Sequence, residues 1–270
     1  MNNLTEVTKE MRIDILEMIT AAGSGHPGGS LSACDIIATL YFEKMNIDPV
    51  RPNWKDRDRF VLSKGHAAPA LYAALAQKGY IPKSDLLTLR KIDSYLQGHP
   101  EMKYTNGVDI STGSLGQGLS IANGMALAAK LDQKNYYVYV LLGDGEIQEG
   151  QIWEAAMSSS HYRLNNVIAL LDYNGLQIDG SNEEIMSLTP IDQKFKSFGW
   201  KVIEIDGHDT SQISQAIDEA KQQMEKPTII IANTIKGKGV SFMEHKGSWH
   251  GTAPNQQQCN TAIKEIRGEQ

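Results

Sequence analysis

The sequence contains few cysteines, no long apolar run and no strong excess of charge of either sign. Cys34 and Cys259, the two cysteines in 270 residues, are too sparse for a disulfide scaffold, so we expect a cytoplasmic protein with reduced thiols. No apolar stretch approaches the about 18 residues of a membrane span. The 26 basic and 32 acidic residues give a net charge of −6, which argues against a nucleic-acid-binding surface. The charged, amphipathic N-terminal segment lacks the apolar core of a signal peptide.

The pattern of apolar residues predicts a helical first part, to about residue 115, with helices over 5–22, 30–43 and 67–78. From about residue 118 onward, short apolar runs that are typical of strands buried on both faces alternate with helix-like segments. The predicted strands are 136–142, 167–171, 201–205 and 228–232, and the predicted helices are 118–131, 151–162, 193–198, 211–223 and a short final one. This order predicts an α/β fold, a parallel sheet flanked by helices on both faces, in a single domain over residues 1–270.

Two loops leave predicted strands with unusual side chains. In an open parallel sheet, ligands bind beyond the carboxyl ends of the strands. Gly143-Asp144-Gly145 follows the strand 136–142, and Asp172-Tyr173-Asn174-Gly175 follows the strand 167–171. Asp144 and Asn174 offer the hard oxygen ligands that Mg²⁺ prefers. Either loop alone is more often a plain turn, but the two together favour a site for a metal and a phosphate group.

Four of the seven histidines lie in glycine-bearing turns rather than on apolar helix faces: His26, His66, His99 and His250. A single histidine in a turn is usually only a solvated side chain. Four in one α/β domain are harder to dismiss, because imidazoles can move protons near neutral pH, although the sequence alone does not bring them together. The other histidines are expected to have a structural role or none: His208, His161 and His245.

The motifs GDGEIQEGQIWEA and LLDYNGLQIDG, with SGHPG, GHA, GHPE and a late HG in this order, resemble the N-terminal half of transketolases, as in split two-subunit members. The resemblance implies thiamine diphosphate as the cofactor and the thiamine-diphosphate-binding fold. It implies that Mg²⁺ (or Ca²⁺ or Mn²⁺) is held by Asp144, Asn174 and the backbone carbonyl of Leu176, and that the Gly145 N–H meets the diphosphate. It also makes all four turn histidines catalytic. His66 and His250 would be donors on the diphosphate side and in the catalytic pocket, while His26 and His99 would line the cleft and hydrogen-bond the sugar hydroxyls and the carbonyl oxygen.

Two further segments carry the resemblance. The loop STGSLGQG, residues 111–118, is similar to the family's glycine-rich loop on the thiazole side, where the Gly113 carbonyl would receive the cofactor's amino group and Leu115 would pack on its rings. Its alternative interpretation is the glycine-rich start of a helix. Glu149 and Glu154 match family carboxylates at a subunit interface, but they equally suit a solvated helix face with an acid in its first turn.

The resemblance covers about residues 5–255, yet these correspond to only the first half of a usual transketolase. The second half supplies the glutamate that protonates the aminopyrimidine and the basic residues that bind the sugar phosphate, and neither is found here. We therefore expect one subunit of a split enzyme. A separately encoded second chain would complete it as an α₂β₂ heterotetramer, which transfers a two-carbon ketol unit from a ketose, expected to be phosphorylated, to an aldose.

Other functions stay open at this stage. One is a different thiamine-diphosphate enzyme, such as the α subunit of a 2-oxoacid dehydrogenase or a deoxyxylulose-phosphate synthase. The pair His26 and His99 favours a sugar instead, because a 2-oxoacid has no hydroxyl groups that need it. Another is a non-catalytic cofactor-binding module, against which the intact Asp144 and Asn174 argue. A nucleotide-binding protein would need a lysine in a phosphate loop or the Rossmann glycine pattern, and the chain has neither.

Overall fold

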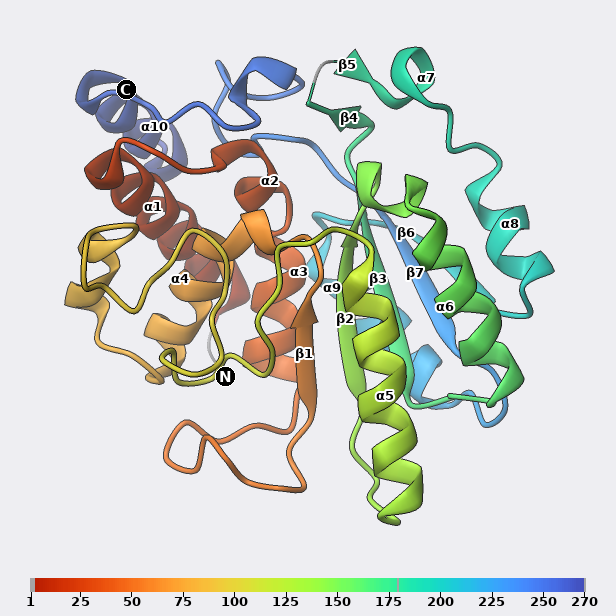
Figure 1. Cartoon of the computed structure of the whole chain (residues 1–270). Helices are drawn as coiled ribbons and strands as arrows, with labels where there is room; N and C mark the ends of the chain where they lie inside the picture. The colour runs from red at the N-terminus through yellow and green to blue at the C-terminus, as the bar shows by residue number, and fades with distance from the viewer. Residues whose placement is uncertain (1–2, 179, 270) are drawn as a thin grey trace.

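A computed structural model describes residues 3–178 and 180–269 and contains a central parallel sheet between layers of helices (Figure 1). All neighbouring strands of this sheet are parallel. The strands are, in spatial order, β1 (Arg59–Leu62), β2 (Val138–Gly143), β3 (Val167–Tyr173), β7 (Thr228–Asn233) and β6 (Lys201–Asp206). The α/β fold with a parallel sheet flanked by helices is therefore confirmed.

The two faces of the sheet bury separate cores, because successive side chains of a strand point to opposite faces. Tyr139 and Leu141 of β2 belong to one core and Val138 and Val140 to the other. The helices packed on the first core include α1 (Leu4–Ala22), α3 (Cys34–Thr39), α4 (Ala68–Lys78), α9 (Thr210–Lys221) and α10 (Gln256–Arg267). Those packed on the second core are α5 (Gln117–Leu131), α6 (Gly150–His161) and α8 (Ile191–Ser197).

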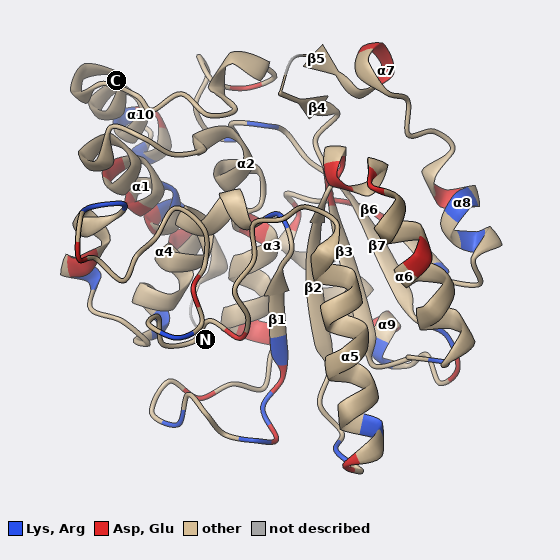
Figure 2. Cartoon of the chain, in the orientation of Figure 1, with Lys and Arg blue, Asp and Glu red and all other residues tan. Residues whose placement is uncertain are grey.

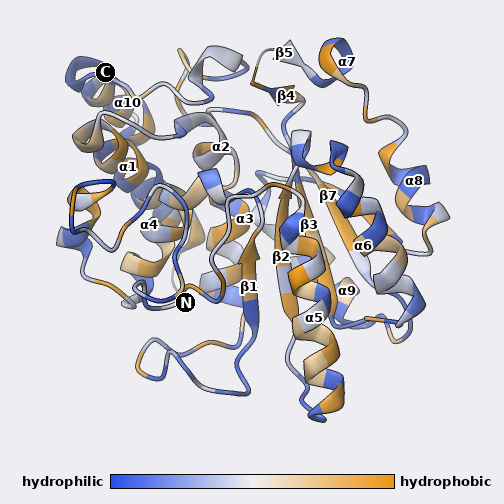
Figure 3. Ribbon diagram, in the orientation of Figure 1, coloured by the Kyte–Doolittle hydropathy of each residue, from blue (hydrophilic) through white to orange (hydrophobic). Residues whose placement is uncertain are grey.

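The distribution of polarity agrees with this layered arrangement. The strands β2, β3 and β7 are mainly hydrophobic in Figure 3, as expected for strands covered on both faces. Most charged residues lie on loops and on the outer helices (Figure 2). None of the helices in the described part of the chain is both long and apolar enough to cross a membrane.

The first part of the chain is less uniformly helical than expected. α1 and α4 agree with the predictions over 5–22 and 67–78. The helix predicted over 30–43 is instead divided among α2 (Pro27–Ser32), α3 and a π-helical turn, η1 (Leu40–Lys44). The expectation of a helical part up to residue 115 is wrong at β1, a strand of four residues. So short an apolar run carries too little periodicity to be assigned from sequence.

In the second part, each predicted strand and helix has a counterpart within a few residues. Short elements that the pattern did not predict surround the carboxyl edge of the sheet, and several of them bear residues of the candidate site. They are β4 (Leu176–Gln177), β5 (Gly180–Ser181), α7 (Asn182–Ile185) and the 3₁₀ turns η2 (Gly65–Ala67), η4 (Gly145–Gln148) and η5 (Gly247–Trp249). A further 3₁₀ turn, η3 (Lys83–Thr88), packs on α1.

Candidate active site

A cavity of about 370 Å³ lies where the loops that follow β1, β2, β3 and β7 meet. This is the carboxyl edge of the sheet, where parallel folds bind ligands. Of the predicted residues, those that line the cavity are His26, His66, His99, Gly113, Leu115, Asp144, Gly145, Glu149, Asn174, Leu176 and His250. The remaining predicted residue, Glu154, does not line the cavity and is exposed on α6.

Strand register explains why the two strand-end loops lie together. Gly143 of β2 stands directly opposite Asp172 of β3, so the loops that begin at Asp144 and Asn174 start side by side. The buried Asp144 carboxylate accepts hydrogen bonds from the backbone N–H of Gly145 (2.9 Å) and of Gly175 (2.7 Å). These bonds hold the carboxylate in one orientation at the cavity wall.

Asn182 also fixes this carboxylate, because its side-chain Nδ2 donates to Asp144 Oδ2 at 2.9 Å. Burial, with the nearby charge of Asp172, raises the pKa of Asp144. A cation next to Asp144 would oppose both effects. Among the described residues, no group of three or more His, Cys, Asp or Glu side chains could hold a metal ion, so any metal here would depend on amide and carbonyl oxygens as well.

Three of the turn histidines form one cluster. The ring centroids of His26, His66 and His250 lie 5.2 to 5.3 Å apart in each pair. His99 lies on a separate wall against Gly113, where a Cβ atom would come within 2.9 Å of the His99 ring. Gly113 has a backbone φ of 145°, a value that residues other than glycine rarely adopt. The close approach of Gly113 to His99 therefore depends on glycine.

The clustered imidazoles are neutral at pH 7. Burial, helped by the positive charge of Arg90, lowers the pKa of His26 to about 4. Burial and the charge of Lys236 lower the pKa of His250 to about 4 as well, and the pKa of His66 lies well below its ordinary value for the same kind of reason. A neutral imidazole has one donor and one acceptor nitrogen. The buried Nδ1 of His26 has no hydrogen-bond partner in the described part of the chain.

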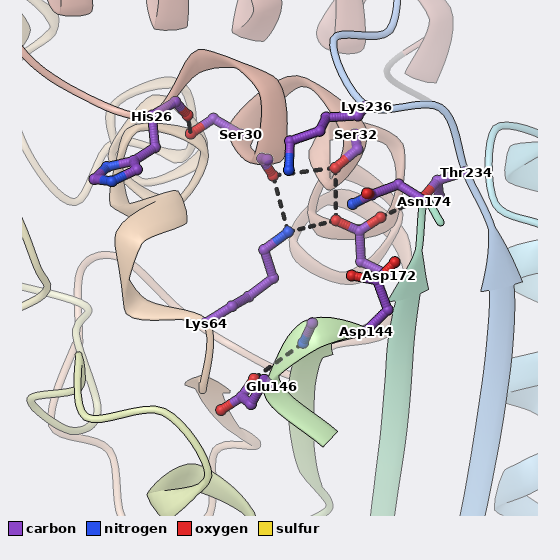
Figure 4. Close-up of polar contacts among 12 residues, drawn as sticks. His26, Ser30, Ser32, Lys64, Asp144, Glu146, Asp172, Asn174, Thr234 and Lys236 are labelled. Carbon is purple, nitrogen blue, oxygen red and sulfur yellow. Dashed lines mark hydrogen bonds and ion pairs between the residues drawn. The ribbon is translucent and has the colours of Figure 1, made fainter. Parts of the chain in front are cut away.

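A buried ion pair that the sequence analysis missed supports the base of the cavity (Figure 4). Lys64 donates to the Asp172 carboxylate and, at 3.1 Å, to the carbonyl oxygen of Gly29. Asp172 also accepts from Ser32 Oγ at 2.6 Å and from Thr234 Oγ1. Burial raises the pKa of Asp172, but Lys64 and these hydrogen bonds outweigh it and hold the pKa below its ordinary value.

Lys236 is a second buried lysine at the cavity, 2% exposed. Its Nζ lies 3.0 Å from His250 Nδ1 and donates to the carbonyl oxygen of Leu176 at 3.3 Å. Burial and the neighbouring charge of Lys64 lower its pKa to about 8, which leaves it largely cationic at neutral pH. Lys236 was not among the residues predicted for the site, although Lys236-Gly-Lys238 forms a short basic cluster in the sequence. The better signal was its place in a glycine-rich loop after a predicted strand.

The remaining candidates are either exposed at the cavity or lie outside it. Leu115 and Glu149 are exposed at the cavity, which is compatible with either interpretation given for them. His208 lies outside the cavity lining, with Nδ1 2.7 Å from Asp35 and Nε2 accepting from the Ile235 N–H at 2.8 Å. It thus supports the loop that leads to Lys236, in line with the structural role expected for it.

One known protein family matches nearly the whole chain. The family described as transketolase, thiamine diphosphate binding domain, matches residues 4–269. The chain belongs to the transketolase family. It is 50% identical over 254 residues to the 6-deoxy-6-sulfo-D-fructose transketolase subunit SqwG of a Clostridium species, and the match covers 94% of this chain and 92% of that protein.

Other transketolases match at lower identity. A subunit of the apulose-4-phosphate transketolase of Phocaeicola vulgatus is 42% identical, and the match covers 96% of this chain and 92% of that protein. Human transketolase is 44% identical over 97% of this chain, but only 42% of its own length is covered. The crystal structure of Campylobacter jejuni transketolase superimposes with a TM-score of 0.94 at 35% identity, covering 100% of this chain and 43% of that one. The chain therefore spans about two-fifths of these longer transketolases.

Proposed function

We propose that this chain is the thiamine-diphosphate-binding subunit of a two-subunit transketolase. Such an enzyme transfers a two-carbon ketol unit from a ketose to an aldose. The observation that carries the proposal is the meeting of the Asp144 and Asn174 loops, two buried lysines and the histidine cluster in one cavity. Two relatives that the chain covers to 92% of their length are named as transketolase subunits, which supports the two-subunit form.

The residues around the cavity fit a diphosphate with a divalent metal. Carboxylate, amide and carbonyl oxygens suit Mg²⁺, and Ca²⁺ or Mn²⁺ could replace it. Lys64 and Lys236 would place positive charge where an anion would bind. The Nδ1 of His26, which has no hydrogen-bond partner among the described residues, could bond to a ligand. The carbonyl of Leu176 accepts from Lys236 but has a second lone pair for a metal. The proposed metal ligands are Asp144, Asn174 and Leu176, and the proposed cofactor contacts are His66, Gly113, Leu115, Gly145, Asn174, Lys236 and His250.

The cofactor, when bound, supplies the nucleophilic carbon that adds to a ketone carbonyl. The residues of this chain would position the substrate and would donate and accept protons. His26 and His99 line the cavity. They are proposed to bind sugar hydroxyls and to donate to the carbonyl oxygen as it gains negative charge. Because His26 and His250 are neutral at pH 7, each can donate at one nitrogen and accept at the other.

A second subunit would complete the site, in a cytoplasmic α₂β₂ assembly, with residues 1–270 acting as one domain. Leu115 and Ile178 expose apolar surface at the cavity, 39% and 67% respectively, which a partner chain could cover. Glu149 and Glu154 lie on exposed surface nearby and are proposed to reach this interface. The related subunits are named for sugars that carry a sulfonate or a phosphate group, so we propose an anionic ketose or aldose as substrate.

The test combines the chain with its second subunit, thiamine diphosphate, Mg²⁺, a phosphorylated or sulfonated ketose and an aldose acceptor. We expect turnover with both chains, none with either alone, and loss of activity in Asp144→Ala. Robust turnover by this chain alone would disprove the two-subunit form. Reaction with pyruvate in preference to the ketose would assign a different thiamine-diphosphate reaction. Full partner-dependent activity in Asp144→Ala would reject the metal site.

A further inference from the structure

Glu146 is a buried carboxylate that lines the cavity. It belongs neither to the proposed metal ligands nor to the proposed cofactor contacts. It is 2% exposed and follows the Gly-Asp-Gly turn by one residue. One carboxylate oxygen accepts from Ser63 Oγ and, at 2.9 Å, from the backbone N–H of Gly116, while the other accepts from the backbone N–H of Gly143 at 2.9 Å. Figure 4 shows it beside the turn that carries Asp144.

Each of these three donors belongs to a different segment of the cavity wall. Ser63 follows β1 and leads to Lys64 and His66. Gly116 lies in the glycine-rich loop as the N-cap of α5, and Gly143 ends β2 before Asp144. Glu146 is therefore a single point where three cavity-lining segments, distant in sequence, are joined.

We propose that Glu146 is a positioning residue that sets the three cavity-lining segments at the spacing required to bind the metal and cofactor. The part of this inference that concerns the cofactor rests on the proposed function. A carboxylate is needed because it only accepts hydrogen bonds. A glutamine would turn an amide N–H₂ toward at least one N–H donor, leaving a buried donor without a partner.

Close packing makes the link rigid. Ser63 is held between Glu146 and α5, because a Cβ atom on Gly118 would come within 2.9 Å of the Ser63 Cα. Gly116 has a φ of 86°, and a Cβ atom there would lie 2.8 Å from the Glu149 Cβ. The donors thus have little freedom to find other partners when the carboxylate is replaced.

The test compares Glu146→Gln and Ser63→Ala with the matched control Asp58→Asn in the full chain. Asp58 is also a buried carboxylate that joins two segments, through the backbone N–H groups of Asn46 and Tyr137, both at 2.8 Å, but it lies before β1, at the opposite edge of the sheet. Two readouts are measured: hydrogen exchange at the Gly116 and Gly143 amides, and the affinity for thiamine diphosphate with Mn²⁺ by calorimetry, with the second subunit present.

We expect Glu146→Gln to accelerate exchange at both amides and to weaken cofactor affinity about tenfold to a hundredfold. Ser63→Ala should give a smaller loss of the same kind and covers the case in which Glu146→Gln does not fold. Asp58→Asn should change neither readout. Wild-type exchange and affinity in both site variants, or a loss of affinity in Asp58→Asn as large as in Glu146→Gln, would overturn the inference. If the wild-type assembly binds no cofactor, the proposed function fails, while the exchange rates still decide whether Glu146 joins the segments.

Discussion

At the scale of single residues, the site is built from ionisable groups whose charge states are set by burial. Burial keeps His26 and His250 neutral at pH 7, whereas the neighbouring Lys64 keeps the pKa of the buried Asp172 below its ordinary value. Uncompensated burial disfavours a charge, and an opposite charge at contact distance restores it. The same cavity therefore offers neutral proton carriers beside fixed cations.

The lowered histidine pKa values predict an acid-sensitive fold. The pKa of His26 and of His250 falls from 6.5 to about 4, so between these pH values the unfolded chain binds more protons than the native chain. Stability from these two groups is complete above pH 6.5 and is lost as pH falls toward 4. We expect the free energy of unfolding, measured with urea from pH 7 to 4, to fall less steeply in His26→Gln/His250→Gln than in wild type. Replacement of the exposed His161 by Gln is the control, and equal slopes for the double variant and wild type would contradict the prediction.

The Lys64–Asp172 pair predicts a large cost for removing one partner. Lys64→Met leaves the fully buried Asp172 carboxylate without its countercharge, which should lower the free energy of unfolding by about 3–5 kcal/mol. Adding Asp172→Asn to this variant should recover part of the loss. Lys196→Met, which breaks the solvent-screened pair with Asp192, should lower the free energy of unfolding far less in the same denaturation series. Equal losses in the two single variants would refute the special role of the buried pair.

At the scale of elements, the position of α5 depends on the contact between its first turn and the end of β1. A Cβ atom on Gly118 would come within 2.9 Å of the Ser63 Cα, whereas Gly124, on the same helix, has nothing within 4 Å of a Cβ. In the interior of a helix, alanine is more favourable than glycine by about 1 kcal/mol. Only packing can reverse that preference.

We therefore expect opposite outcomes for the same substitution in one helix. Gly124→Ala should raise the free energy of unfolding by about 0.5–1 kcal/mol, and Gly118→Ala should lower it by about 1–3 kcal/mol because the backbone must shift. Thermal and urea unfolding of the two variants measure the difference. Stabilisation by both substitutions would show that α5 does not need this close approach.

The sequence predicted elements well where a helical period or a continuous apolar run extends over many residues, as in α1, β2 and β3. It failed for β1 and for the β4–β5 hairpin, because runs of two to four residues hold no measurable period. The site followed the same division. Asp144 and Asn174 were found because they directly follow long buried strands, while Lys64, Glu146 and Asp172 were missed because only tertiary packing shows that their charges are buried.

At the scale of the whole molecule, the cavity is open on the side where Leu115 and Ile178 are exposed. If the proposed second subunit covers this side, a charge introduced there should oppose assembly. We expect Ile178→Glu to weaken association with the second subunit by about tenfold or more, since an apolar interface residue can contribute over 1 kcal/mol.

The control for assembly is Val50→Glu, because Val50 is 86% exposed in the segment before β1, away from the cavity. Analytical ultracentrifugation of each variant with the second subunit gives the association constants. Equal association by Ile178→Glu, Val50→Glu and wild type would place the interface elsewhere.

The pairing of Gly143 with Asp172 has one more consequence. If β3 slipped by one residue along β2, Asn174 would move about 3.3 Å relative to Asp144, and every side chain of β3 would turn to the wrong core. The packing of the two apolar cores therefore fixes the distance between Asn174 and Asp144. A mutation that loosened either core would change the geometry of the cavity even though it replaced none of the residues that line it.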